Sequence, residues 1–186
     1  MFGKNNQIEY ADDSKESIGR LFILRIPPLI IGLILGIGLS FVTSSLEKVI
    51  TKNVEVAFFI PFIVYIADAV GTQTQNIYIR SLKTGKASFK KYFVKESIFG
   101  TVLGLIFGLV VLTVVFFWFK SIQLALAIAL SVFMTIALAP IVALIVTEIF
   151  ELEHTDPAVG SGPITTIIQD AISIVIYGII ISALIV

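Results

Sequence analysis

The sequence predicts an all-α integral membrane protein with five membrane-spanning helices. Its composition and the spacing of its charged residues are the observations that predict it. Of the 186 residues, 57% are apolar and 14% are charged, whereas soluble domains have about 45–50% apolar and about 25% charged residues. The mean hydropathy is +1.02, so a soluble globule of this size would expose large apolar patches to water. A single soluble domain is therefore excluded.

Long intervals without charged residues define the five spans. A charge at the bilayer centre costs about 2.5–3.5 kcal/mol on insertion scales, and a spanning helix needs about 20 apolar residues. Five such intervals occur, and only Asp68 and Asp170 interrupt them. They place the spans at about 24–46, 56–80, 97–119, 121–147 and 163–186. The runs are too long and continuous for the short alternating strands of a membrane barrel.

The first 20 residues are polar and mixed in charge. They are too polar for the start of a signal peptide. We expect residues 1–20 to form a cytoplasmic tail or an interfacial helix, and residues 21–186 to form one five-span domain.

The placement of lysine and arginine predicts the orientation in the plasma membrane. Ten of the 13 basic residues lie before the first span or in the loop between the second and third spans, and only Lys48, Lys52 and Lys120 fall on the other side. Basic residues favour the cytoplasmic side, so we expect a cytoplasmic N-terminus and an external C-terminus. The acidic loop from Glu148 to Asp156 is then also cytoplasmic, and it is either a solvated loop or a regulatory element.

The overall charge and the missing residue types exclude several functions. The formal net charge is zero, which excludes nucleic-acid binding through bulk positive charge. The chain has no cysteine and one histidine, so disulfides, thiolate zinc sites and multi-histidine metal sites are excluded. Nothing in the sequence predicts an organic cofactor.

Two spans carry small residues at helical spacing. Gly100, Gly104 and Gly108 recur every four residues in the third span, and Gly32 and Gly36 do so in the first. Small residues on one face let helix backbones approach closely in lipid. These faces therefore predict helix packing, and a hinge or a pore-facing backbone is the alternative.

Polar residues in the second and fifth spans are of a different kind, because each span contains a carboxylate. In the second span Thr72, Gln73, Gln75 and Asn76 follow Asp68. In the fifth span the polar or small residues recur along one helical face: Gly162, Thr166, Asp170, Ser173 and Tyr177. Such stripes indicate helix faces that avoid lipid.

Apart from Arg25 at the edge of the first span, no lysine or arginine lies inside a span, so neither aspartate has a clear basic partner. An unpaired carboxylate in the membrane must be protonated, face water or bind a cation. Either aspartate could instead be a buried structural group held by hydroxyls or backbone N–H groups. Oxygen ligands without thiolate or imidazole favour hard cations such as Mg²⁺ or Ca²⁺. One or two aspartates per chain are too few for a complete cage, and a two-fold symmetric homodimer would double them.

Two segments carry a family resemblance. The first is FIPFIVYIADAVGTQTQNIYIRSLKTG (59–85), with Pro61, Gly71, Gln73, Arg80, Leu82 and Gly85. At these residues it is similar to the second span of the membrane domain of the MgtE magnesium transporter family, which vertebrate solute-carrier magnesium transporters share.

The second segment is DPAVGSGPITTIIQDAISIVIY (156–177), which resembles the closing signature of the same family. The matching residues are Asp156, Pro157, Ala158, Ser161, Gly162, Pro163, Thr165, Thr166, Asp170 and Tyr177. With five spans in matching order, the resemblance covers about residues 20–186.

The resemblance implies a homodimeric pathway for largely hydrated Mg²⁺ along the two-fold axis, lined by the second and fifth helices. It implies that Asp170 binds the ion and that Gly162, Thr165, Thr166, Gly71, Gln73 and Ser173 belong to the pathway. Pro61, Asp156, Pro157 and Pro163 belong to its structural motifs.

The sequence departs from the family pattern at two places. Asp68 stands where the family usually has glycine, so it could add a second metal ligand, alter selectivity or carry a coupling ion. Bacterial members also usually have cytoplasmic N-terminal and CBS domains, and only about 20 residues precede the spans here. We expect that regulatory part to be absent from this chain.

Three other functions remain as alternatives. A sodium- or proton-coupled exchanger would use the same site. A non-conducting scaffold or sensor subunit would have no use for the polar stripes. An intramembrane aspartyl protease would need a Tyr-Asp pair and a Gly-x-Gly-Asp sequence, but Asp68 follows Ala67 and Asp170 follows Gln169. We therefore expect a transporter of divalent cations, Mg²⁺ above all, and no enzyme.

Overall fold

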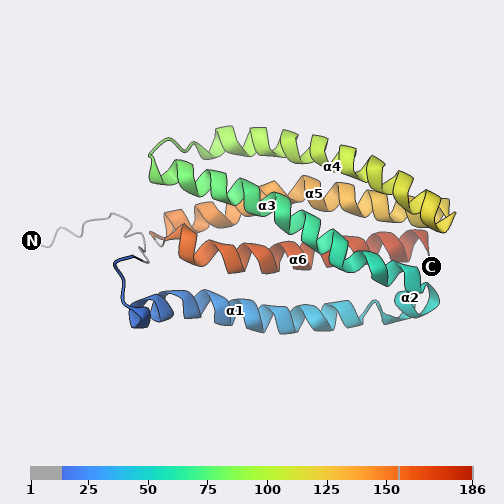
Figure 1. Ribbon diagram of the computed structural model, residues 1–186, viewed down its shortest axis with the longest axis horizontal. Coiled ribbons are helices and arrows are strands. Elements are labelled where there is room, and N and C mark those ends of the chain that lie inside the picture. Colours follow the sequence, from blue (N-terminus) through green and yellow to red (C-terminus); the bar gives the residue numbers. More distant parts are fainter. Residues whose placement is uncertain (1–13, 155, 186) are drawn as a thin grey trace, which may run out of the picture.

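The computed structural model describes residues 14–154 and 156–185, which form helices and short connections and contain no strand. Five long helices are joined by short segments (Figure 1). The elements are α1 (Ile18–Ser44), α2 (Glu47–Lys52), the 3₁₀ helix η1 (Val54–Phe59), α3 (Ile60–Lys83), α4 (Phe89–Phe119), α5 (Ile122–Leu152) and α6 (Pro157–Leu184). Within this part of the chain five helices are long and apolar enough to cross a membrane. The predicted all-α, multi-pass membrane fold is therefore confirmed, and the homodimer stays a prediction.

Several helices begin earlier than the charge-free intervals that predicted them. α4 begins at Phe89 and α6 at Pro157, against the expected starts at about 97 and 163. The physical reason is that charge-free intervals measure only the part of a helix that lies in hydrocarbon, and helices continue into the headgroup region. At α6 the start is set locally, because Asp156 Oδ1 accepts a hydrogen bond from the Ala158 N–H at 2.9 Å and Pro157 occupies the first turn.

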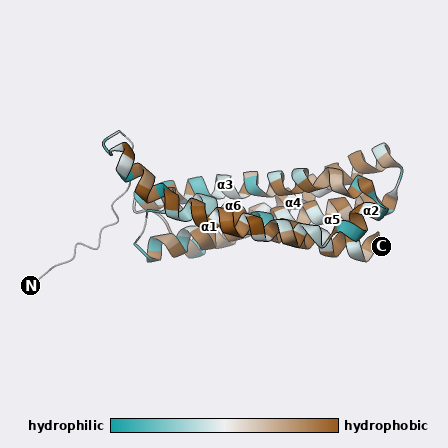
Figure 2. Cartoon of the chain, turned by 90° about the horizontal axis from the view of Figure 1, so that it is seen from below, coloured by the Kyte–Doolittle hydropathy of each residue, from teal (hydrophilic) through white to brown (hydrophobic). Residues whose placement is uncertain are grey.

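α5 is the central helix of the bundle. It packs against α3, α4 and α6, whereas α1 lies along the outside and contacts α6 (Figure 1). Pro28 is the one buried residue of α1, and apolar residues cover much of the length of the helices (Figure 2). Lipid can cover such surfaces, so α1 needs little protein contact to remain stable.

Glycine faces hold two of the helix pairs together. A Cβ built at Gly104 would lie 2.7 Å from the Phe133 carbonyl oxygen of α5, and one at Gly100 would lie 3.0 Å from the Ala137 carbonyl oxygen. On α1, a Cβ at Gly36 would be 3.7 Å from Ile167 Cδ1 of α6. The predicted close packing is confirmed between α4 and α5, whereas on α1 a Cβ at Gly36 would make only ordinary van der Waals contact.

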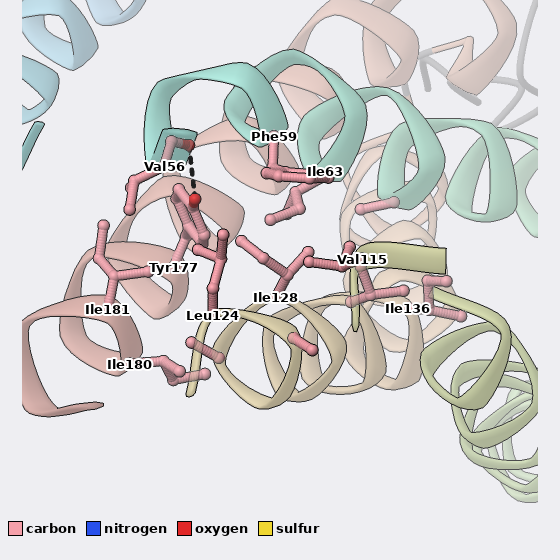
Figure 3. Packing of buried hydrophobic residues seen from close by; sticks show 14 of the residues in the cluster. Val56, Phe59, Ile63, Val115, Leu124, Ile128, Ile136, Tyr177, Ile180 and Ile181 are labelled. Atoms are coloured by element: carbon pink, nitrogen blue, oxygen red, sulfur yellow. Dashed lines mark hydrogen bonds between the residues drawn. The ribbon is translucent and has the colours of Figure 1, made fainter. Parts of the chain in front are cut away.

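One end of the bundle is closed by an apolar core. Buried residues from η1, α3, α4, α5 and α6 meet there, among them Val56, Ile63, Val115 and Ile128 (Figure 3). The Tyr177 hydroxyl of α6 donates a hydrogen bond to the Val56 carbonyl oxygen at 2.6 Å. η1 and the start of α3 therefore cover the C-terminal half of α6.

The connections separate into two ends of the molecule. The start of α1, the α3–α4 turn and the α5–α6 turn lie at one end, and the C-terminus lies at the other (Figure 1). The basic second loop and the acidic fourth loop thus share an end. The orientation of that end toward the cytoplasm stays a prediction.

Candidate functional site

The interface between α3 and α6 is polar, and α6 contributes two neighbouring polar stripes to it. The first stripe is spaced by four residues, and each member is at most 2% exposed: Ser161, Thr165, Gln169, Ser173 and Tyr177. The second stripe is only partly buried and consists of Gly162, Thr166 and Asp170. One face of α6 is thus closed inside the protomer, and the adjacent face is partly open.

The face of α6 that the sequence predicted is only partly open. Ser173 and Tyr177, which follow Asp170 along it, are 1% exposed. The cause is the cover that η1 and the start of α3 place over this half of α6. Thr165 is likewise 1% exposed.

The two aspartates are brought to the same part of the α3–α6 interface. The Thr166 hydroxyl donates a hydrogen bond to Asp68 Oδ1 at 2.9 Å, and Asp170 follows Thr166 by one helical turn on the same face. Asp170 lies near the middle of α6, and its Oδ1 is buried without a hydrogen-bond partner among the described residues. A single chain therefore joins Asp68 to Thr166 and carries Asp170 one turn farther along the same face of α6.

Those oxygens do not form a complete metal cage within one chain. Among the residues that the structure describes, no group of three or more histidine, cysteine, aspartate or glutamate side chains is placed to hold a metal ion. The donors present, carboxylate and hydroxyl oxygen, are the ligands that Mg²⁺ and Ca²⁺ prefer. Water or a second copy of the chain would have to supply the rest of the coordination.

Other predicted pathway residues occupy different environments. Gln73 is exposed and Gly71 is buried. Gly162 has open space where a Cβ would stand, with no atom within 4 Å. Gln73 and Gly162 are therefore accessible, while Gly71 lies inside the bundle.

A buried glutamine on α3 closes the inner side of this interface. Gln75 Nε2 donates hydrogen bonds to Ser161 Oγ at 2.8 Å and to Thr165 Oγ1 at 3.1 Å. Thr165 is therefore buried because its hydroxyl points toward Gln75 and not toward the partly open face of α6.

A second buried glutamine, Gln169, was missed by the sequence analysis. Its Nε2 donates a hydrogen bond to the Ala139 carbonyl oxygen of α5 at 3.0 Å. A Cβ at Gly71 would stand only 1.8 Å from that nitrogen. The four-residue spacing of Ser161, Thr165 and Gln169 is the one signal that could have indicated it.

Two further carboxylates, Glu96 and Glu148, accept hydrogen bonds from α3 near the end of the bundle that carries the basic loop. The Thr74 hydroxyl donates to Glu96 Oε2 at 2.7 Å, and the Tyr78 hydroxyl donates to Glu148 Oε2 at 2.5 Å. The rings of Tyr78 and Tyr92 lie 4.9 Å apart. Glu96 and Glu148 served only as markers of span ends in the sequence analysis, but they bind the second half of α3 to α4 and α5.

The proline motifs lie at or near helix starts. Pro61 is in the first turn of α3 and Pro157 in the first turn of α6, where a missing N–H costs nothing. Pro163 lies inside α6 and removes one backbone hydrogen bond from that helix. The residues of these motifs therefore set helix starts and local geometry on the two helices that carry the aspartates.

The fold and the site together define a polytopic membrane protein with a polar intramembrane interface. A model of the MgtE family, described as "Divalent cation transporter", matches residues 60–180. The chain belongs to this family, which is one of transporters and not of enzymes, and the resemblance that the two sequence segments indicated is confirmed.

Individual relatives agree with that assignment. The chain is 31% identical over 156 residues to the magnesium transporter MgtE of Enterococcus faecalis and 27% identical over 156 residues to that of Bacillus subtilis. These alignments cover 82% of this chain, and 34% and 35% of the two relatives. A third relative, the magnesium transporter MgtE of Thermus thermophilus, is 24% identical over 160 residues, covering 84% of this chain and 35% of that relative. The chain thus spans about a third of the length of the relatives that it matches.

Proposed function

We propose that the chain forms a membrane pathway for divalent cations, with Mg²⁺ as the transported ion. α3 and α6 line the pathway, and Asp170 and Asp68 are its metal ligands. The observation that carries the proposal is the meeting of Asp68, Thr166 and Asp170 on a partly open face between these two helices. Membership of a family of divalent cation transporters supports the same reading.

The charge of the site supports a divalent ion. Two carboxylates in a membrane interior are costly unless a cation or protons neutralise them. No lysine or arginine lies between Arg25 and Lys48, between Lys52 and Arg80, or after Lys120, so the spans that form the site contain no basic partner. A divalent ion neutralises both aspartates at once, and hydrated Mg²⁺ can be held by carboxylates through its water shell.

A two-fold homodimer completes the pathway in this proposal. Lipid cannot satisfy the accessible polar atoms on the partly buried α6 face that carries Thr166 and Asp170, so that face must meet water or protein. A second copy related by a two-fold axis would present the same face and enclose an aqueous path between the two chains. Gly162 and Gln73 then lie along that path. The absence of a side chain at Gly162 and the amide group of Gln73 both suit a hydrated ion.

Passive flux is sufficient for uptake. A divalent cation gains about 4.6 kcal/mol for each 100 mV of inside-negative potential. A coupled sodium or proton exchanger is distinguished from a passive pathway by imposing sodium and pH gradients, because passive Mg²⁺ flux responds to neither.

The test is Mg²⁺ flux into liposomes that contain the purified full chain. The parent protein is compared with Asp170→Asn and Asp68→Asn, and with Glu153→Gln, an exposed glutamate outside the site, as the matched control. We expect Asp170→Asn to abolish flux, Asp68→Asn to reduce it, and Glu153→Gln to conduct like the parent. Parent-like flux through Asp170→Asn would refute the assigned ion site, and absence of flux from the parent would refute the transport function.

A further inference from the structure

Gln169 joins three helices at the level of the two aspartates. Its side chain is 2% exposed, it donates to the Ala139 carbonyl oxygen of α5 at 3.0 Å, and it fills the space that the missing Cβ of Gly71 leaves on α3. The amide oxygen Oε1 is buried without a hydrogen-bond partner among the described residues. Removing a buried acceptor from water without a partner costs about 1–3 kcal/mol, so a leucine or methionine would be the ordinary choice for stability alone.

The position of Gln169 relative to the ion site is fixed by helix geometry. Gln169 precedes Asp170, so the two side chains leave α6 about 100° apart, one toward α3 and α5 and the other toward the partly open face. Asp68 lies one turn before Gly71 on α3, and Thr166, its hydrogen-bond donor, lies one turn before Gln169 on α6. Because α3 and α6 run in opposite directions (Figure 1), these two one-turn steps point opposite ways along the bundle, and the Gly71–Gln169 contact lies at about the same depth in the interface as the Asp68–Thr166 contact.

The two contacts of Gln169, with Gly71 of α3 and with the Ala139 carbonyl oxygen of α5, restrict rotation of α6. A turn of α6 about its own axis would move the amide of Gln169 either into the backbone at Gly71 or away from the Ala139 carbonyl oxygen. The same turn would carry Asp170 away from Thr166 and Asp68 or out of the open face.

We propose that Gln169 is a positioning residue that, together with Gly71, sets the rotation of α6 and so holds Asp170 beside Asp68 and Thr166 in the ion site. It does not touch the ion. This inference rests on the proposed function, because the property that it controls is the affinity of the site for the transported cation. Partners that orient metal ligands from outside the coordination sphere typically change metal affinity by about 10–100-fold when they are removed.

The first experiment compares Gln169→Met with Tyr177→Phe. Methionine keeps the length and volume of glutamine and removes both polar groups of its amide. Tyr177 is the matched control, since it also lies on the buried stripe of α6 and also donates to a backbone carbonyl, that of Val56 at 2.6 Å. It lies about 12 Å farther along the helix at about 1.5 Å per residue. Mg²⁺ flux is measured against Mg²⁺ concentration for each purified full-length variant in liposomes.

We expect Gln169→Met to raise the half-saturating Mg²⁺ concentration about tenfold or more. We expect Tyr177→Phe to leave this concentration unchanged even though it lowers thermal stability. Equal half-saturation in parent and Gln169→Met would overturn the positioning role while leaving the transport function intact. An equal rise in both variants would assign the effect to general loosening of α6 and overturn it as well.

A second pair of variants separates positioning from packing. In Gly71→Ala the new Cβ must displace the Gln169 amide, so both thermal stability and Mg²⁺ affinity fall. In the double variant Gly71→Ala with Gln169→Ala the steric conflict is removed, so thermal stability recovers relative to Gly71→Ala. We expect half-saturation in the double variant to stay raised. Recovery of Mg²⁺ affinity together with stability would show that Gln169 only fills space and would refute the inference.

Discussion

The close contact between α4 and α5 at Gly104 predicts a measurable loss of stability when a single methyl group is added. In Gly104→Ala the new Cβ lies 2.7 Å from the Phe133 carbonyl oxygen, 3.3 Å from Phe133 Cδ2 and 3.4 Å from the Ala137 nitrogen. The closest of these atoms belongs to backbone, so the two helices must separate. Gly38 on α1 is the matched control, because a Cβ there has no atom within 4 Å.

The expected magnitude follows from the difference between these two variants. Replacing glycine by alanine inside a helix gains about 0.5–1 kcal/mol from backbone entropy, and both variants share that gain. Overpacking costs about 1–3 kcal/mol, and only Gly104→Ala incurs it. At about 2–4 °C per kcal/mol for a chain of this size, Gly104→Ala should melt about 2–12 °C below Gly38→Ala.

The assay is thermal unfolding of both purified variants, followed by the fluorescence of Trp118. This is the only tryptophan in the chain, and its ring stacks on Phe119 with centroids 4.9 Å apart at the end of α4. A graded result is expected for Gly100→Ala, whose nearest contact is 3.0 Å. If Gly104→Ala melts at or above Gly38→Ala, α4 and α5 do not pack through this face, and the reasoning is refuted.

Three further outcomes are expected. Added Mg²⁺ should raise the melting temperature of the parent protein and not that of Asp170→Asn. The reason is that a ligand that binds only the folded state stabilises it, by about 2.7 kcal/mol at 100 times Kd. An equal rise in both proteins would place the stabilising ion elsewhere. Gln75→Met should lower stability by about 1–3 kcal/mol, since two buried hydroxyls of α6 lose their donor, and a circular dichroism melt that matches the parent would contradict this. Tyr78→Phe should cost about 1.5–3 kcal/mol in the same assay through loss of the hydrogen bond to the Glu148 carboxylate, and it should leave half-saturation by Mg²⁺ unchanged.

The number of spans could be predicted from the sequence because the cost of charge in hydrocarbon acts on each residue separately. Their arrangement could not. Within the membrane α4 and α5 are apolar around most of their circumference, so the pattern of apolar residues does not indicate which face meets which neighbour. The glycine face of α4 was visible as a repeat, but its partner is a row of α5 backbone carbonyls that every helix possesses. The central position of α5 therefore follows from how the helix surfaces fit together and could not be read from the pattern of apolar and polar residues.

The candidate site was predicted in part for a related reason. Asp68 and Asp170 stand out because charge is rare in a span. Gln169 does not stand out, because what it contacts is a carbonyl oxygen of α5 and the absence of a side chain at Gly71. Neither of these partners has a signature in the sequence.

The two faces of α6 differ in how their polar groups are hydrogen-bonded, and the difference matters because the helix lies in lipid. On the closed face, Ser161 and Thr165 accept hydrogen bonds from Gln75, and Tyr177 donates to the backbone. These bonds are made within one chain, so folding alone satisfies the hydrogen-bonding groups of these residues.

The adjacent face differs in that respect. Asp170 Oδ1 has no partner among the described residues, and the one bond that reaches this face joins Thr166 to another carboxylate. In water such groups would be hydrated and uninformative. In a bilayer the accessible polar atoms of this partly open face cannot be left to the lipid, so water, an ion or another protein surface must satisfy them. In the pathway that we propose, a hydrated divalent cation would offset part of the charge of these aspartates, and the waters of its shell would donate hydrogen bonds to their accessible oxygens.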